Sequence, residues 1–260
     1  MGEISVEEKS DLIARMRAIT VSREYGSGGG EIARRLAARL GWQLIDHEIV
    51  RRVAQELHVS IAQAEAHDER VESTVSYILK SVQAIHPTML AIAPLPLSRE
   101  VRNYHEALSK VVKAAAIAGH VVIVGRGSQA LLAGERDVLH VRIVAPLEQR
   151  IRYVMQREAL NRDAAHARIM LKDQDRARYL QVAHRRNPGD PYLYDLIVNT
   201  AVLDLDSAVD LIQLALERKA ARISQPTGQL GPAAGLPRYP GQPRDLRPPR
   251  DISEPPNEKQ

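Results

Sequence analysis

The segment Ile19–Ala33, which reads ITVSREYGSGGGEIA, is the most informative part of the sequence about the fold. A short β-branched run leads into glycines and a serine, and apolar residues then recur with helical spacing from Ile32 to Leu40. In this strand–glycine turn–helix order, backbone N–H groups at the start of a helix can surround phosphate oxygens. We therefore predict that the amides of Gly26–Gly30 bind an anion, in preference to the alternative of a tight turn without a ligand.

The same stretch lacks two side chains that usually accompany such a turn. A phosphate-binding loop of the G-x-x-x-x-G-K-[ST] type has a lysine for the β- and γ-phosphates and a hydroxyl for Mg²⁺. Here Gly28 is followed by Gly29, Gly30 and Glu31. Glu31 favours the helix dipole, and the sequence leaves open whether it repels a phosphate or helps to hold a cation.

The composition excludes several classes of protein. The chain has 260 residues, enough for one sizeable α/β domain with an appendage, and its core must be aliphatic because phenylalanine is absent. With no cysteine, disulfides, thiolate zinc sites and cysteine nucleophiles are excluded. Acidic residues near Met1 argue against a signal peptide, and the longest apolar stretch is too short to span a bilayer. We expect a cytoplasmic protein with no membrane partner.

The net charge of +4 is compatible with anionic ligands such as nucleotides. No basic–aromatic stripe accompanies this charge, so we do not expect a nucleic-acid partner. The sequence leaves the oligomeric state open.

Strand-like runs alternate with helical patterns along the chain, which predicts a parallel sheet built from strand–helix–strand units. Most of these runs are near-continuous in Val, Ile and Leu, as expected of strands that are covered on both faces. The five runs are Ala18–Ser22, Trp42–Asp46, His120–Gly125, Val138–Val144 and Tyr194–Asn199. The expected fold class is therefore α/β.

A long helical insertion is predicted between the second and third strands, over about residues 47–118. Asp46 could cap its first helix, and Ser98 opens a helix that Gly119 ends. After the fourth strand, Leu147–Leu160 is predicted to be helical, with Pro146 at its start.

Two further segments have distinctive compositions. Residues 161–191 are strongly charged and end in closely spaced Asn, Pro and Gly, which is typical of a mobile flap. From Ser224 onward proline and glycine dominate and hydrophobic periodicity is lost, so residues 224–260 are predicted to be a disordered tail appended to a domain of residues 1–223.

Several motifs in a fixed order resemble the cytidylate kinase-like branch of the P-loop nucleoside monophosphate kinases. The resemblance extends over about residues 18–216. The matching segments are Ser22–Gly29 (SREYGSGG), Gly41–Asp46 (GWQLID), Ile123–Ala130 (IVGRGSQA) and Tyr194–Thr200 (YDLIVNT). It implies a three-layer P-loop kinase fold with strand order 2-3-1-4-5, a helical insertion that binds the monophosphate and a lid over the donor phosphates at about residues 161–191.

The resemblance also implies roles for individual residues. Arg126 matches an arginine that contacts the acceptor phosphate, and Arg176 and Arg178 match the arginine-rich run of the lid. Asp46, for which helix capping is an equally good explanation, and Arg52 match residues that bracket the acceptor site; His47 is assigned no chemistry. The implied donor-binding residues are Gly26, Ser27, Gly28, Gly29, Gly30 and Glu31, and no protein metal ligand is predicted.

The sequence departs from this family pattern in its cations and carboxylates. Neither Gly29 nor Gly30 supplies the usual basic residue, although Arg23 or a lid arginine could partly replace it. Val124 and Gly127 stand where cytidylate kinases have carboxylates beside the arginine. Selectivity for cytosine is therefore not expected to be strong.

These observations lead to one main hypothesis about function and two alternatives. The first is transfer of the γ-phosphoryl of ATP, with Mg²⁺ held largely by the nucleotide, to a nucleoside monophosphate (CMP-like) or a similar small acceptor. The alternative is a catalytically degenerate kinase that binds nucleotide as a sensor or scaffold. A nucleic-acid-associated module that uses the basic tail is the weakest of the three.

Overall fold

The computed structural model describes residues 11–46 and 99–231, although the side chains of residues 99–105 and of residue 107 are not described. The predicted start of the insertion, including Arg52 and His47, lies outside these residues, as does the tail from residue 232. Contacts divide the chain into residues 1–223 and residues 224–260. In the second unit the described part contains a 3₁₀ turn, η2 (Thr227–Gln229).

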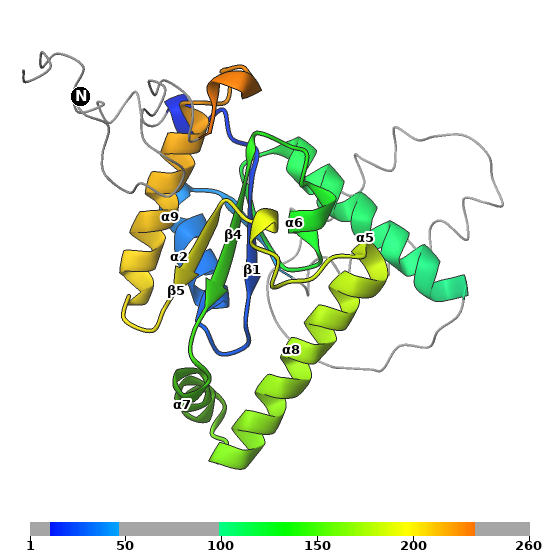
Figure 1. The fold of residues 1–260 in the computed structure, drawn as a ribbon, viewed down its shortest axis with the longest axis vertical. Coiled ribbons are helices and arrows are strands. Elements are labelled where there is room, and N and C mark those ends of the chain that lie inside the picture. The colour runs from blue at the N-terminus through cyan, green and yellow to red at the C-terminus, as the bar shows by residue number, and fades with distance from the viewer. Residues whose placement is uncertain (1–10, 47–98, 232–260) are drawn as a thin grey trace, which may run out of the picture. The chain divides into compact units, whose positions relative to one another are not determined.

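The first unit is built around a five-stranded parallel sheet with helices on both faces (Figure 1). The strand order is β2-β3-β1-β4-β5, which confirms the predicted order. The strands are β1 (Ala18–Arg23), β2 (Gln43–Ile45), β3 (Val121–Val124), β4 (Val138–Val144) and β5 (Leu196–Asn199). The helices are α2 (Gly29–Leu40), α5 (Arg99–Ala118), α6 (Ser128–Leu131), α7 (Leu147–Glu158), α8 (Arg162–His184) and α9 (Leu205–Ala220), with a 3₁₀ turn η1 (Pro191–Leu193).

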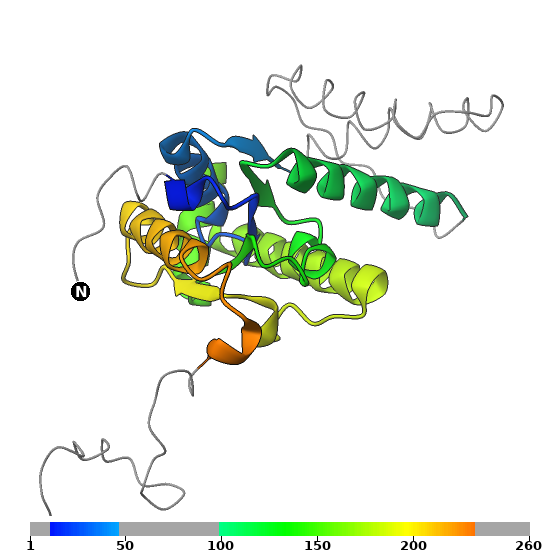
Figure 2. The ribbon, with the colours of Figure 1, turned by 90° about the horizontal axis from the view of Figure 1, so that it is seen from above.

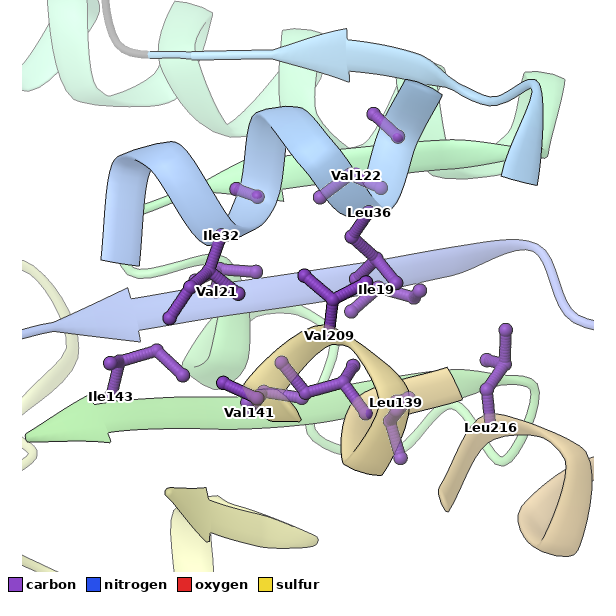
Figure 3. Close-up of a cluster of buried hydrophobic side chains, with 14 of the residues drawn as sticks. Ile19, Val21, Ile32, Leu36, Val122, Leu139, Val141, Ile143, Val209 and Leu216 are labelled. Atoms are coloured by element: carbon purple, nitrogen blue, oxygen red, sulfur yellow. The ribbon is translucent and has the colours of Figure 1, made fainter. Parts of the chain in front are cut away.

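The sheet faces pack against different helices because side chains alternate along each strand. Ile19 and Val21 of β1 belong to a cluster with α2 and α9, whereas Ala18 belongs to a cluster with α5. Figures 1 and 2 show α2 and α9 on one side of the sheet and α5 and α6 on the other. Figure 3 shows how Leu36 and Val209 reach the face formed by β1, β3 and β4.

Helix α8 occupies the segment for which the sequence predicted a mobile flap. It is continuous for 23 residues, and Asn161 caps it by accepting a hydrogen bond from the Ala164 amide at 2.8 Å. Ala165 and Ile169 are fully buried in a cluster with Ile151 and Val154 of α7. The segment is therefore packed on the domain in this structure, and its motion remains a prediction.

None of the helices in the described residues is both long and apolar enough to cross a membrane.

Candidate anion site at the carboxyl ends of β1 and β3

The glycine loop (residues 24–30) joins β1 to α2 with two left-handed residues. Gly26 has φ of +82° and Gly28 has φ of +79°, values that glycine adopts without a steric penalty. The amide of Ile32 donates to the carbonyl of Gly28 at 3.0 Å. The amides of Gly29 and Gly30 precede this bond in the first turn of α2, where helical N–H groups have no partner within the helix. We therefore expect these two amides to be available to an anion.

Three glycines of the loop lie too close to other atoms to accept a side chain. A Cβ atom on Gly26 would lie 2.9 Å from the Arg150 carbonyl oxygen, and one on Gly28 would lie 2.7 Å from Leu205 Cδ2. On Gly29 it would lie 2.6 Å from the Cβ of Arg23, whereas a Cβ on Gly30 would meet no atom within 4 Å. The loop therefore has room for a side chain at one glycine, Gly30.

Hydrogen bonds hold the loop against the neighbouring strands. The Ser27 hydroxyl lies within hydrogen-bond distance of the carbonyls of Glu24 (2.9 Å) and Ile143 (3.2 Å). Thr200, after β5, donates its hydroxyl to the Ser27 carbonyl at 3.0 Å. The Glu24 carboxylate accepts from the amide of Ala145 at 3.1 Å. In this structure the Ser27 side chain thus fixes the loop rather than facing an open site.

Arg23, the last residue of β1, extends toward the turn that follows β3. A Cβ on Gly125 would lie 2.2 Å from the Arg23 Nη1 atom, so the guanidinium uses the space that this glycine leaves. Burial, followed by the charges of Arg176 and Arg126, lowers the pKa of Arg23 to about 9, and Asp46 opposes this shift. Arg23 is thus still a cation at neutral pH, in a place where positive charge is destabilised.

Arg126 lies in a turn in which three successive residues are left-handed. Its φ is +60°, between Gly125 at +76° and Gly127 at +65°. Such a conformation costs a non-glycine residue roughly 1–2 kcal/mol, and strain of this kind is common where a side chain must be presented to a ligand. The imidazole of His184, at the end of α8, occupies the space where Gly127 would have a Cβ, 2.4 Å from Nε2.

Helix α8 contributes two charged residues that contact the loop. The Asp173 carboxylate accepts a hydrogen bond from the Tyr25 amide at 2.7 Å and also binds Arg150. Arg176 donates to the Arg23 carbonyl at 3.2 Å, and its guanidinium lies 5.3 Å from the centre of the Tyr25 ring. Burial is the main cause that lowers the pKa of Arg176. Arg176 and Arg126 both lie close enough to Arg23 to lower its pKa. Three arginines therefore converge beside the glycine loop.

The remaining predicted site residues have different positions. Arg178 is exposed on α8. Glu31 forms ion pairs with Arg34 (2.7 Å) and Arg35 (3.0 Å), and these hydrogen bonds lower the pKa of its carboxyl to about 2. The charge of the Glu31 carboxylate is therefore neutralised by two arginines of the same helix, α2. Asp46 is half-buried and close enough to Arg23 to raise its pKa.

The described residues do not form a metal site. Within residues 11–46 and 99–231, no three His, Asp or Glu side chains are grouped so as to hold an ion. The positions that usually supply the hydroxyl ligand hold Gly30 and Glu31, and Glu31 is engaged by two arginines. These residues do not fit a protein-held Mg²⁺, and no step is assigned to one.

Sequence reasoning missed the residues that brace the site. Arg150 lies 3.6 Å from the Glu24 carboxylate and also pairs with Asp173, while Arg142 lies 3.8 Å from Glu24. In the sequence these residues look like ordinary charges on a strand and two helices. The spacing of Ile169, Asp173, Arg176 and Leu180 along one face of α8 could have revealed that this face is packed.

Comparisons with known proteins identify relatives of this chain. A model of the cytidylate kinase-like family matches residues 18–202. Uronate isomerase of Corynebacterium glutamicum is 31% identical over 98 residues, which are 38% of this chain and only 19% of that protein's length. A solved structure of an uncharacterized protein from Eubacterium ventriosum is 21% identical with a TM-score of 0.58, covering 78% of this chain and 99% of that one. Shikimate kinase from Bacteroides thetaiotaomicron is 16% identical with a TM-score of 0.42, covering 78% and 99%.

Proposed function

Because this chain belongs to the cytidylate kinase-like family, we propose that it binds ATP on the glycine loop and transfers the γ-phosphoryl group to a nucleoside monophosphate or a similar small acceptor. In this reaction an acceptor oxygen forms a bond to the γ-phosphorus while the bond to the leaving ADP oxygen breaks. Such transfer depends mainly on positioning and on neutralising the charge of the phosphoryl oxygens.

The convergence of three arginines beside the loop is the observation that best supports this proposal. Arg23 ends β1 and Arg126 follows β3, at the edge of a parallel sheet where ligands of open α/β folds bind. The charges of Arg126 and Arg176 both lower the pKa of Arg23, so the three lie close together. Buried cations that repel one another are stabilised by a bound anion, and a polyphosphate is an anion of suitable size and charge.

Most of the predicted residues have a role in this proposal. The amides from Gly26 to Gly30 bind the donor phosphates, with Ser27 holding the loop in shape. Arg126 binds the acceptor phosphate, and Arg176 contacts the transferring phosphoryl group from α8. Asp46 and Arg52 border the acceptor. Arg178 reaches the phosphates only if α8 moves, since it is exposed here.

The test is an assay of ADP formation by the purified protein with ATP, Mg²⁺ and a panel of nucleoside monophosphates. We expect slow turnover, because removing one preorganised charge-stabilising group commonly costs about 10²–10³ in rate. We also expect weak preference for CMP, since Val124 and Gly127 offer no carboxylate to read the base. Phosphorylation of CMP at tens per second with strong discrimination against AMP and UMP would contradict this proposal.

One observation favours the second candidate, a nucleotide-binding sensor or scaffold without catalysis. Side chains of α8 already contact the loop: Asp173 accepts from the Tyr25 amide at 2.7 Å, and Arg176 donates to the Arg23 carbonyl at 3.2 Å. A nucleotide that displaces these contacts would change the position of α8 without any chemistry. ATP binding measured by calorimetry, with no ADP formed from any acceptor, would support this second function.

A further inference from the structure

We infer that Arg23 is the cation that binds the donor phosphates in this protein, in the place that glycine loops of this type otherwise give to a lysine after the last glycine. The inference rests on the proposed nucleotide binding. Its evidence is the way in which Arg23 packs between two glycines, Gly29 and Gly125.

The position of the usual lysine is closed in this protein. A Cβ on Gly29 would lie 2.6 Å from Arg23 Cβ, 3.2 Å from Arg23 Cγ and 3.3 Å from Ile143 Cβ. The first of these distances is far below van der Waals contact, and the atoms belong to the stem of Arg23 and to β4 rather than to the free end of a side chain. A side chain at position 29 and a side chain at position 23 therefore exclude each other.

Arg23 delivers its charge to the site from the end of β1. Its stem passes Gly29, and its guanidinium fills the space beside Gly125, where a Cβ would lie 2.2 Å from Nη1. Glycine therefore occupies both positions, 29 and 125, against which the Arg23 side chain packs. This path places the guanidinium between the glycine loop and the turn that holds Arg126, where donor and acceptor phosphates would meet.

The surrounding charges make this position suited to a phosphate. The charges of Arg176 and Arg126 disfavour a cation at Arg23, and Asp46 is the acidic group of the described residues whose charge favours it. Asp173 pairs with Arg176 at 3.5 Å, so the cost falls mainly on Arg23, where burial and the two neighbouring arginines disfavour the charge. A phosphate group offers several acceptor oxygens to guanidinium forks and would reduce this cost.

The experiment measures the affinity for tripolyphosphate and for ATP by calorimetry, using the full chain. Arg23→Met keeps the apolar stem and removes the charge, and we expect it to weaken both ligands about 10- to 100-fold, as for loss of a charged hydrogen bond. Arg23→Lys should retain more of the affinity than Arg23→Met. Arg218→Met, at an exposed arginine of α9, is the matched control and should bind as the wild type does.

A rescue variant tests whether a cation supplied from another position of the glycine loop can replace Arg23. Because a Cβ on Gly30 meets no atom within 4 Å, a lysine there can reach phosphates bound at the start of α2. We expect Gly30→Lys in the Arg23→Met background to recover part of the lost affinity. Gly29→Lys in the same background should recover less, because methionine keeps the Cβ and Cγ atoms that a Cβ at position 29 would meet and Ile143 also crowds that position.

The outcomes separate this inference from the proposed function. Unchanged tripolyphosphate affinity in Arg23→Met, or no tripolyphosphate binding by the wild type, overturns the inference. Absence of both ATP binding and ADP formation in the wild type, with Arg23-dependent tripolyphosphate binding intact, overturns the proposed function alone. If Arg23→Met does not fold, Gly125→Ala decides in the same assay, because its new Cβ would displace the guanidinium while the arginine remains.

Discussion

The interior of the sheet and the carboxyl ends of its strands differ in the side chains that they bring together. In the interior, Ile19 and Val21 alternate with Ala18 and Thr20, and the polar side chains that enter are paired: the Thr20 hydroxyl lies 2.8 Å from His140 Nδ1. At the carboxyl ends, three arginines lie close together and one of them has a left-handed backbone.

This contrast indicates where the chain is optimised for stability and where it is not. Apolar burial in the interior contributes to folding with every methylene group. Repelling cations and the left-handed Arg126 oppose folding, and under the proposed function they are retained because they bind an anion. Substitutions should therefore affect stability in the interior and ligand binding at the carboxyl ends.

The largest effect is expected in the interior, from Leu216→Ala in α9. Leu216 is fully buried against the sheet (Figure 3), and removing such a side chain leaves a cavity that costs about 2–5 kcal/mol. Denaturant titration should show this loss while the folded variant keeps its affinity for tripolyphosphate. Leu214→Ala, at a residue of the same helix that is 46% exposed, should cost far less. A large loss of tripolyphosphate affinity in the folded Leu216→Ala protein would contradict the expectation that substitutions in the interior leave ligand binding unchanged.

Gly28→Val should abolish ATP binding, the largest effect expected at the carboxyl ends. Gly28 has φ of +79°, which a β-branched residue adopts only with strain, so valine should shift the loop backbone; its Cβ would also lie 2.7 Å from Leu205 Cδ2. Calorimetry should detect no ATP binding, while circular dichroism remains near native. Gly134→Val, at an exposed glycine with no atom within 4 Å of its would-be Cβ, is the control for a glycine-to-valine change. Wild-type ATP affinity in Gly28→Val would refute a phosphate-binding role of the loop.

The sequence predicted the interior well because burial follows directly from the order of residues. Near-continuous runs of Val, Ile and Leu predicted β4 with its observed bounds, Val138–Val144, and β1 to within one residue. The carboxyl ends were predicted only in part. The glycine loop and Arg126 belong to local motifs, so they were identified. The contacts of Asp173 with Tyr25, 148 residues away in the chain, depend on tertiary packing that no local pattern encodes.

Two substitutions of Arg126 distinguish the backbone strain of the turn after β3 from the contribution of the guanidinium to ligand binding. Arg126→Gly and Arg126→Ala both remove the guanidinium, so each should weaken tripolyphosphate binding about 10-fold or more. Only glycine relieves the φ of +60°, although its greater freedom in the unfolded chain offsets part of the gain. Denaturant titration should therefore show Arg126→Gly to be more stable than Arg126→Ala by up to about 1 kcal/mol. Equal stability of the two variants would contradict this prediction.

A smaller effect concerns His140, the buried polar group of the interior. Its Nε2 lies 3.2 Å from the Leu132 carbonyl, which can only accept, so Nε2 holds the proton and Nδ1 accepts from Thr20. Burial, aided by Lys219 and opposed by Asp195, lowers the pKa of His140 below its usual 6.5.

The unfolded chain therefore takes up this proton first as the pH falls. The contribution of His140 to stability is complete above pH 6.5 and declines as the pH drops from 6.5 to the folded pKa, by at most about 1.4 kcal/mol per pH unit. Denaturant titrations across this window should show a steeper loss for the wild type than for His140→Gln. Equal slopes would mean that His140 is protonated in both states or in neither.

The smallest effect is expected from removing the tail after Ile223. Residues 224–260 form a unit of their own by contacts and are rich in proline and glycine, so they offer little apolar surface that could stabilise the sheet or its ligand site. The truncated protein should keep its melting temperature and its affinity for tripolyphosphate. A melting temperature lowered by more than about 4 °C, which for a domain of this size corresponds to roughly 1 kcal/mol, would show that the tail stabilises the domain. A change in affinity at constant melting temperature would instead show that the tail influences ligand binding without stabilising the fold.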